Sequence, residues 1–150
     1  MAMARRILAV SSPGGHWVQL QSMREAFRGL EVSWVCPAAQ RAVPAGERHF
    51  KVSDASKRTP WRIPALVFRF IWIFLRVRPH VVISTGAAPG AFAILLGRCF
   101  GARTIWVDSV ACAERTSLSG RIAGPCAHLW LTQWEHLAQS KGPRFAGSLL

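Results

Sequence analysis

Acidic residues are scarce in this sequence, which has 7 Asp and Glu against 19 Lys and Arg and a formal net charge of +12. Such an excess of positive charge predicts an anionic partner: nucleic acid, an acidic membrane surface or a phosphorylated substrate. Aromatic residues interleaved with arginine also suit single-stranded nucleic acid, but no recognisable nucleic-acid motif is present. We therefore expect a membrane surface or a phosphorylated substrate, and no nucleic acid.

Paired cysteines are also missing, since the four cysteines (Cys36, Cys99, Cys112 and Cys126) form no C-x-x-C motif. This scatter argues against a zinc site and against a disulfide framework, and it predicts buried thiols in a reducing compartment. No apolar signal-peptide core precedes the first strand, which predicts a cytoplasmic protein. The standard phosphate-binding motifs G-x-G-x-x-G and G-x-x-x-x-G-K-[ST] are absent as well.

The chain itself is apolar enough for a packed core, with 51% hydrophobic residues in a length of 150. Short apolar runs predict strands at 5–11, 31–36, 49–52, 80–85, 103–109 and, as the last strand, 128–132. Helical patterns predict helices at 16–29, 60–77, within 86–101 and before residue 127. Strands that alternate with helices predict one α/β domain over residues 1–150, with a doubly wound parallel sheet.

Three unusual loops follow strands of this sheet: Ser11–His16, Ser84–Gly90 and Asp108–Ser119. Ligands of open α/β sheets bind beyond the carboxyl ends of the strands. In the first loop, Gly14 and Gly15 allow close backbone approach at a helix N-terminus, and His16 carries an imidazole, the side chain that most often acts as a general base. The alternative is a tight strand-to-helix turn that His16 caps.

The segment WRIPALVFRFIWIFLRVR predicts a helix with Arg62, Arg69 and Arg76 along one edge, because they are seven residues apart. Its other residues are almost all large and apolar, including Trp61 and Trp72. It is too short and too charged to span a bilayer, and it suits a helix lying in the membrane interface. The alternative is a crossover helix packed on the sheet with its arginines outward.

The third loop begins at Asp108, an acid at the end of a hydrophobic strand. It could serve as an acid, a base or a substrate anchor, and Arg115 with nearby hydroxyls could bind phosphate or sugar. The alternative is structural, with Asp108 and the hydroxyls capping turns and helices.

Three segments carry a family resemblance: SSPGGHWVQL, PHVVISTGAAPG and, most specifically, WVDSVACAERTSLSGRIAGPCAHLWLTQWEHL. With them the chain resembles the membrane-bound subunit of the bipartite GlcNAc transferase that makes dolichyl-diphosphate-chitobiose, and its bacterial exopolysaccharide (PssD-type) counterparts. The resemblance implies a Rossmann-like domain equivalent to the N-terminal half of a GT-B glycosyltransferase. It also implies a separate subunit, the C-terminal half, which binds the UDP-sugar.

This resemblance implies transfer of a sugar from a UDP-sugar to a polyprenyl-diphosphate-linked saccharide, with no cofactor and no metal. The implied place is the cytoplasmic face of the inner (plasma) membrane, with peripheral or monotopic attachment. His16 is the first candidate for the catalytic base and Asp108 the second. The expected substrate-binding residues are Gly14, Gly15, Thr85, Gly86, Ser109, Arg115 and Ser119, and the expected membrane-binding residues are Trp61, Arg62, Arg69, Trp72 and Arg76.

Three departures from the family pattern affect these expectations. The eukaryotic subunit has an amino-terminal transmembrane helix, so here helix 60–77 would serve as the anchor. Asp108 stands where the family often has Glu, which favours an anchoring role, and Trp17 stands where Thr usually follows the histidine. The first rival function is a non-catalytic anchor that recruits the catalytic subunit, and the second, weaker one is a basic nucleic-acid-binding domain. We expect the apolar tail RFAGSLL to dock the catalytic subunit.

Overall fold

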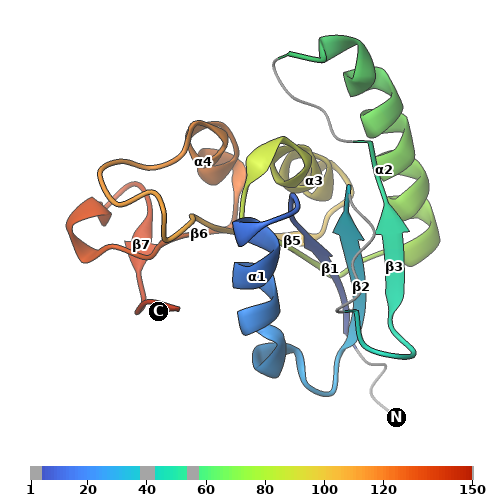
Figure 1. Cartoon of the computed structure of the whole chain (residues 1–150), viewed down its shortest axis with the longest axis horizontal. Coiled ribbons are helices and arrows are strands. Elements are labelled where there is room, and N and C mark those ends of the chain that lie inside the picture. The colour runs from blue at the N-terminus through green and yellow to red at the C-terminus, as the bar shows by residue number, and fades with distance from the viewer. Residues whose placement is uncertain (1–4, 38–42, 54–57, 150) are drawn as a thin grey trace.

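The computed structural model describes residues 5–37, 43–53 and 58–149, and within them a single parallel sheet has the strand order β3-β2-β1-β4-β5-β6-β7 (Figure 1). Strands β1 and β4 are neighbours in the sheet, although β2 and β3 lie between them in the sequence. The predicted doubly wound α/β fold is therefore confirmed. The strands are β1 (Arg6–Val10), β2 (Glu31–Cys36), β3 (Arg48–Lys51), β4 (Val81–Ser84), β5 (Arg103–Val107), β6 (Leu129–Thr132) and β7 (Arg144–Phe145).

Helices cover both faces of the sheet. On one face, the core is built by α1 with the turn that follows it, and on the other by α2, α3 and α4. Since both faces are covered, the central strands are apolar almost throughout, as parallel strands usually are. The helices are α1 (Gly15–Ser22), α2 (Ile63–Val77), α3 (Ala87–Cys99) and α4 (Leu118–Ala123), and the 3₁₀ turns are η1 (Arg24–Phe27), η2 (Pro60–Arg62), η3 (Gly124–Cys126) and η4 (Glu135–Leu137).

Helix α2 has one buried side and one exposed side. Its buried side chains recur at helical spacing and pack against the sheet: Leu66, Phe70, Ile73, Phe74 and Val77. Full burial of each such side chain contributes roughly 1.5–3 kcal/mol. The helix ends at Arg78, whose φ of 48° gives a left-handed cap, and Pro79 follows. The alternative of a packed crossover helix is thus confirmed for one side of α2.

Two predicted elements differ from the structure. The helix expected at 16–29 ends at Ser22, and a tighter 3₁₀ turn follows, which brings Phe27 against Trp34 with ring centroids 6.1 Å apart. Strand 128–132 is also not the last strand, because β7 pairs with β6 beyond it. With only two residues, β7 shows no alternation that a sequence pattern could reveal.

The four cysteines divide into two groups. Cys36 is buried and Cys112 is half-buried, but Cys99 and Cys126 are exposed. The prediction of buried thiols is therefore wrong for Cys99 and Cys126. Each of these two is the last residue of a helix or 3₁₀ turn at the surface.

Candidate functional site

The three unusual loops lie side by side at the carboxyl edge of the sheet. They follow β1, β4 and β5, which are neighbours in the strand order. From β1 the chain crosses to β2 on one side, whereas β4 leads on to β5 on the other. This reversal between β1 and β4 is the switch point at which open α/β sheets bind ligands. The fold thus confirms the predicted placement of the loops.

His16 lies at this switch point, in the first turn of α1. Its Nδ1 is 2.9 Å from the carbonyl oxygen of Thr85, and the Thr85 hydroxyl donates to the His16 carbonyl over 2.7 Å. Because a carbonyl oxygen only accepts, the contact assigns the proton of the neutral ring to Nδ1. The lone pair of the neutral ring then lies on Nε2, for which no described residue is a hydrogen-bond partner. This is the tautomer that a general base at Nε2 requires.

Gly86 lies directly against the His16 imidazole. Its φ of 144° is a conformation that residues with a side chain rarely adopt. A Cβ atom at Gly86 would lie 2.5 Å from both Cε1 and Nδ1 of His16, which is far inside contact distance. The next residue, Ala87, has a φ of 63° and begins α3. Only glycine at position 86 therefore lets the two loops interlock around the His16 ring.

Gly14 and Gly15 have a different environment from Gly86. A Cβ atom at either position would meet no other atom within 4 Å, so these two glycines border open space. Gly14 has a φ of 81°, which turns the chain into α1. The first-turn N–H groups of α1 and α3 lack partners within their own helices and lie at the edge that His16 occupies. The arrangement has room and hydrogen-bond donors for an anionic or hydroxyl-rich ligand.

Asp108 is buried, with 1% of its surface exposed. Its carboxylate accepts hydrogen bonds from the indole N–H groups of Trp106 (3.2 Å) and Trp130 (3.0 Å) and from the hydroxyl of Ser117 (2.7 Å). The backbone N–H of Ser117 is a further, longer contact at 3.4 Å. A Cβ atom at Gly120 would lie 2.6 Å from Oδ1, so backbone also encloses the group. These contacts favour the structural alternative, in which Asp108 fixes its own loop, over a role as acid, base or substrate anchor.

The loop after Asp108 is tied to α1 by Gln19. Its side-chain amide donates to the Asp108 carbonyl over 3.1 Å, and its Oε1 accepts from the backbone of Val110 at 3.3 Å. Ser109 is buried beside this bridge, and its hydroxyl accepts from the N–H of Ala111. Sequence reasoning missed Gln19, although a polar residue at a buried position of an amphipathic helix is a usable signal.

Arg115 lies in the loop between β5 and α4, and Ser119 lies in α4. Arg115 lines a separate hollow of about 420 Å³ formed by residues 111–118 and Arg121. No hydrogen bond or ion pair within the described ranges joins Arg115 or Ser119 to His16. Ser117 caps α4 by accepting from the N–H of Gly120, so the helix-cap alternative is confirmed for that hydroxyl. Burial and the Asp108 charge raise the pKa of the Cys112 thiol in the same hollow.

The predicted membrane-binding residues share one exposed surface. We define the outer face of α2 as the large exposed side chains of η2 and α2. They are Trp61, Arg62, Phe68, Arg69, Trp72, Leu75 and Arg76. Of the described helices, none has the length and apolar character that a bilayer-spanning segment needs.

Solved structures define the class of fold. The chain matches MurG of Acinetobacter baumannii with a TM-score of 0.74 at 11% identity, over 94% of this chain and 45% of that one. It matches the UDP-N-acetylglucosamine 2-epimerase of Rickettsia bellii with a TM-score of 0.73 at 9% identity, over 98% of this chain and 46% of that one. At such identity the likeness concerns the fold alone. The chain has the Rossmann-like half of a GT-B fold.

Sequence comparison then gives the family. The profile of the family described as "Oligosaccharide biosynthesis protein Alg14 like" matches residues 45–149, and the chain belongs to this family. The UDP-N-acetylglucosamine transferase subunit ALG14 of Eremothecium gossypii is 34% identical over 83 residues, which are 51% of this chain and 37% of that protein. Its namesake of Yarrowia lipolytica is 37% identical over 73 residues, or 45% and 33% of the two chains. The aligned segments thus span about a third of these relatives, 37% of one and 33% of the other.

Proposed function

We propose that the chain is one subunit of a two-component glycosyltransferase, which moves a sugar from a UDP-sugar to a polyprenyl-diphosphate-linked saccharide. Family membership and relatives named as transferase subunits support this proposal. The observation that carries it is the His16 imidazole, which the Thr85 carbonyl orients at the switch point so that Nε2 can accept a proton.

In the proposed reaction, a hydroxyl oxygen of the acceptor saccharide bonds to the anomeric carbon of the donor sugar. The bond from that carbon to the diphosphate oxygen breaks, and UDP leaves with the bonding electrons. Nε2 of His16 takes the proton of the attacking hydroxyl, a role that typically accelerates a reaction by about 10²–10⁴. Gly14 and Gly15 leave room for the acceptor, and the first-turn amides of α1 and α3 donate hydrogen bonds to it.

The donor half belongs to a separate subunit under this proposal. This chain covers only 45% and 46% of the two solved structures with a GT-B fold. More than half of each of those proteins has no counterpart in it. The second Rossmann-like half would bind the UDP-sugar, which is a substrate rather than a cofactor. The two subunits together would close the cleft over His16.

The test is His16→Ala in the complex reconstituted on vesicles with its donor-binding subunit. We expect turnover to fall at least ~10²-fold, while binding to the partner and to vesicles is unchanged. His80→Gln is the matched control, because His80 is an exposed histidine just before β4, at the opposite edge of the sheet. Unchanged turnover of His16→Ala would remove the base from this subunit.

A non-catalytic anchor is the second candidate, and the burial of Asp108 favours it, because the other candidate base is withdrawn from solvent. In that case His16→Ala stays active, and variants of the outer face of α2 lose activity by leaving the membrane. The proposed attachment is peripheral, on the cytoplasmic face of the membrane, through the exposed aromatic and arginine side chains of that face.

The proposed partner surface is the carboxyl-terminal tail. Phe145 in β7 and Leu149 are exposed although both are large and apolar, and the N–H of Leu149 donates to the Gln133 side chain over 2.8 Å. Deleting residues 144–150 would remove β7 and perturb the sheet, so point variants test the surface better. Phe145→Ser with Leu149→Ser should weaken co-purification with the donor-binding subunit at least ~10-fold without lowering the melting temperature, and Leu30→Ser is the control at an exposed leucine elsewhere.

A further inference from the structure

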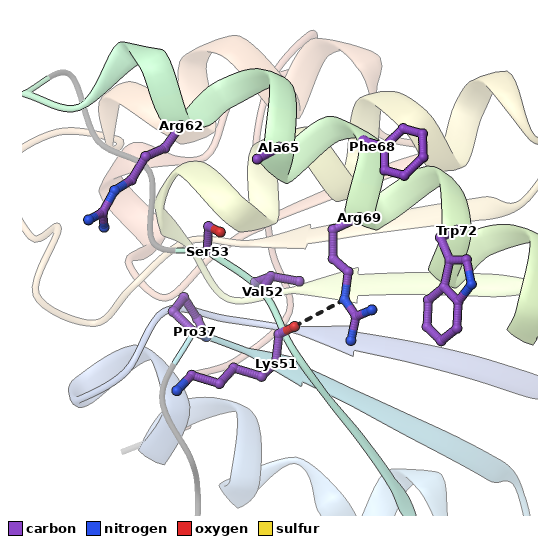
Figure 2. Close-up of a pocket in the computed structure, with 9 residues that line it drawn as sticks. All are labelled: Pro37, Lys51, Val52, Ser53, Arg62, Ala65, Phe68, Arg69 and Trp72. Carbon is purple, nitrogen blue, oxygen red and sulfur yellow. Dashed lines mark hydrogen bonds between the residues drawn. The ribbon is translucent and has the colours of Figure 1, made fainter.

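A groove of about 900 Å³ lies between α2 and the carboxyl ends of β2 and β3 (Figure 2), and His16 is not among its lining residues. Strand β2 lies between β3, which borders the groove, and β1, which leads to His16. Neighbouring strands are about 4.8 Å apart, so β3 lies roughly 10 Å from β1. Of the residues that the structure describes, three cationic side chains line it: Lys51 from β3, and Arg62 and Arg69 from the α2 side. None of its described lining residues is acidic.

Arg69 is held in place rather than free in solvent. Its Nε donates to the carbonyl of Lys51 over 3.3 Å, and its guanidinium lies 4.6 Å from the centroid of the Trp72 ring. Its Nη groups make no hydrogen bond to any described residue. Among the described carboxylates, none pairs with Lys51 or Arg62 either. Three like charges around one groove repel each other, and a bound anion would relieve that repulsion.

The outer wall of the groove is aromatic. Phe68 is 75% exposed and Trp72 is 44% exposed, and both also belong to the outer face of α2. Exposed aromatic side chains grouped in this way mark a surface that contacts another apolar body. A ligand that satisfies the whole groove therefore needs a compact anionic group joined to an apolar chain. Inorganic phosphate and free nucleotides lack the apolar chain.

We propose that this groove binds the phosphate headgroup of an acidic membrane phospholipid. Lys51, Arg62 and Arg69 contact the headgroup phosphate, and the acyl chains leave along Phe68 and Trp72 into the bilayer. The inference rests on the membrane association proposed above and adds lipid selectivity to it. It also assigns to membrane binding a residue of the sheet, Lys51, that lies outside α2.

The test compares two double variants that lower the net charge equally. Lys51→Gln with Arg62→Gln removes two cations of the groove, and Arg24→Gln with Arg103→Gln removes two exposed cations from other surfaces. Binding of the full chain is measured by co-sedimentation with phosphatidylcholine vesicles that contain or lack phosphatidylglycerol. We expect the groove variant to lose about thirtyfold in affinity for the phosphatidylglycerol vesicles and the control variant less than about threefold. Trp72→Ala should weaken binding to both kinds of vesicle.

Several outcomes would overturn the proposal. Equal losses in the two double variants would mean that net charge alone drives binding. Displacement of the chain from vesicles by millimolar inorganic pyrophosphate, at constant ionic strength, would assign the groove to free phosphates. If the groove variant lost affinity only for neutral vesicles that carry a prenyl diphosphate, the groove would bind the acceptor lipid instead. If the unaltered chain bound no vesicles at all, the membrane association in the proposed function would fail as well.

Discussion

His16 and Asp108 both follow the carboxyl end of a central strand, but their surroundings differ. The His16 ring has one nitrogen bonded to the Thr85 carbonyl, and its other nitrogen has no partner among the described residues. The Asp108 carboxylate accepts from two indoles and a serine hydroxyl and is almost fully buried. A polar residue at a strand end can therefore be oriented to bind or react with a substrate, or it can fix a loop. The number of hydrogen-bond partners that the protein itself supplies distinguishes the two roles.

The largest effect that we predict on this comparison comes from Asp108→Asn. An amide can accept on one side only, so its NH₂ group must face indole or hydroxyl donors that the carboxylate satisfies. We expect the free energy of unfolding to fall by about 2–3 kcal/mol, measured by urea denaturation. Turnover per folded molecule should change less than about tenfold. Glu114→Gln, at an exposed carboxylate of the same loop, is the control.

If Asp108→Asn kept full stability but abolished turnover, the comparison would be reversed. Asp108 would then be the catalytic acid or base, and His16 the structural residue. Measuring both quantities on the same preparations is what separates these cases.

The next effect concerns the glycines around His16. Gly86→Ala forces a Cβ atom against the imidazole at a φ of 144°, so we expect a loss of about 1–3 kcal/mol in unfolding free energy and turnover as low as that of His16→Ala. Gly15→Ala meets open space, so its unfolding free energy should change by less than about 1 kcal/mol. Its turnover should still fall about tenfold, because the added methyl group occupies the room left for the acceptor.

Thermal unfolding and turnover of the two glycine variants provide the measurement. Full activity in Gly15→Ala would show that the open space at the turn is not used by a substrate. Full activity in Gly86→Ala would show that the position of the His16 ring does not matter, which would contradict its proposed role.

The sequence predicted the sheet well because its strands are buried on both faces and stand out as short apolar runs between turns. The interlock of His16 with Gly86 joins residues about seventy positions apart, and local periodicity contains no information on such a contact. The same holds for Asp108, because its carboxylate is enclosed in part by Trp130 of β6, which lies 22 positions further along the chain. The groove beside α2 was missed for a related reason: Lys51 becomes its neighbour only through the path of β3.

The smallest effect concerns His49, a histidine whose setting differs from that of His16. Burial lowers the pKa of His49, whose ring lies 6.5 Å from the Trp17 ring, and its buried Nε2 has no hydrogen-bond partner among the described residues. The unfolded chain therefore binds a proton at a higher pH than the folded chain, so His49 makes stability fall as the pH drops below about 6.5. His49→Phe should reduce this loss, measured as the difference in urea midpoint between pH 7.5 and pH 5.5. If His49→Phe and the unaltered chain lose equal stability over this interval, the acid sensitivity arises at other groups.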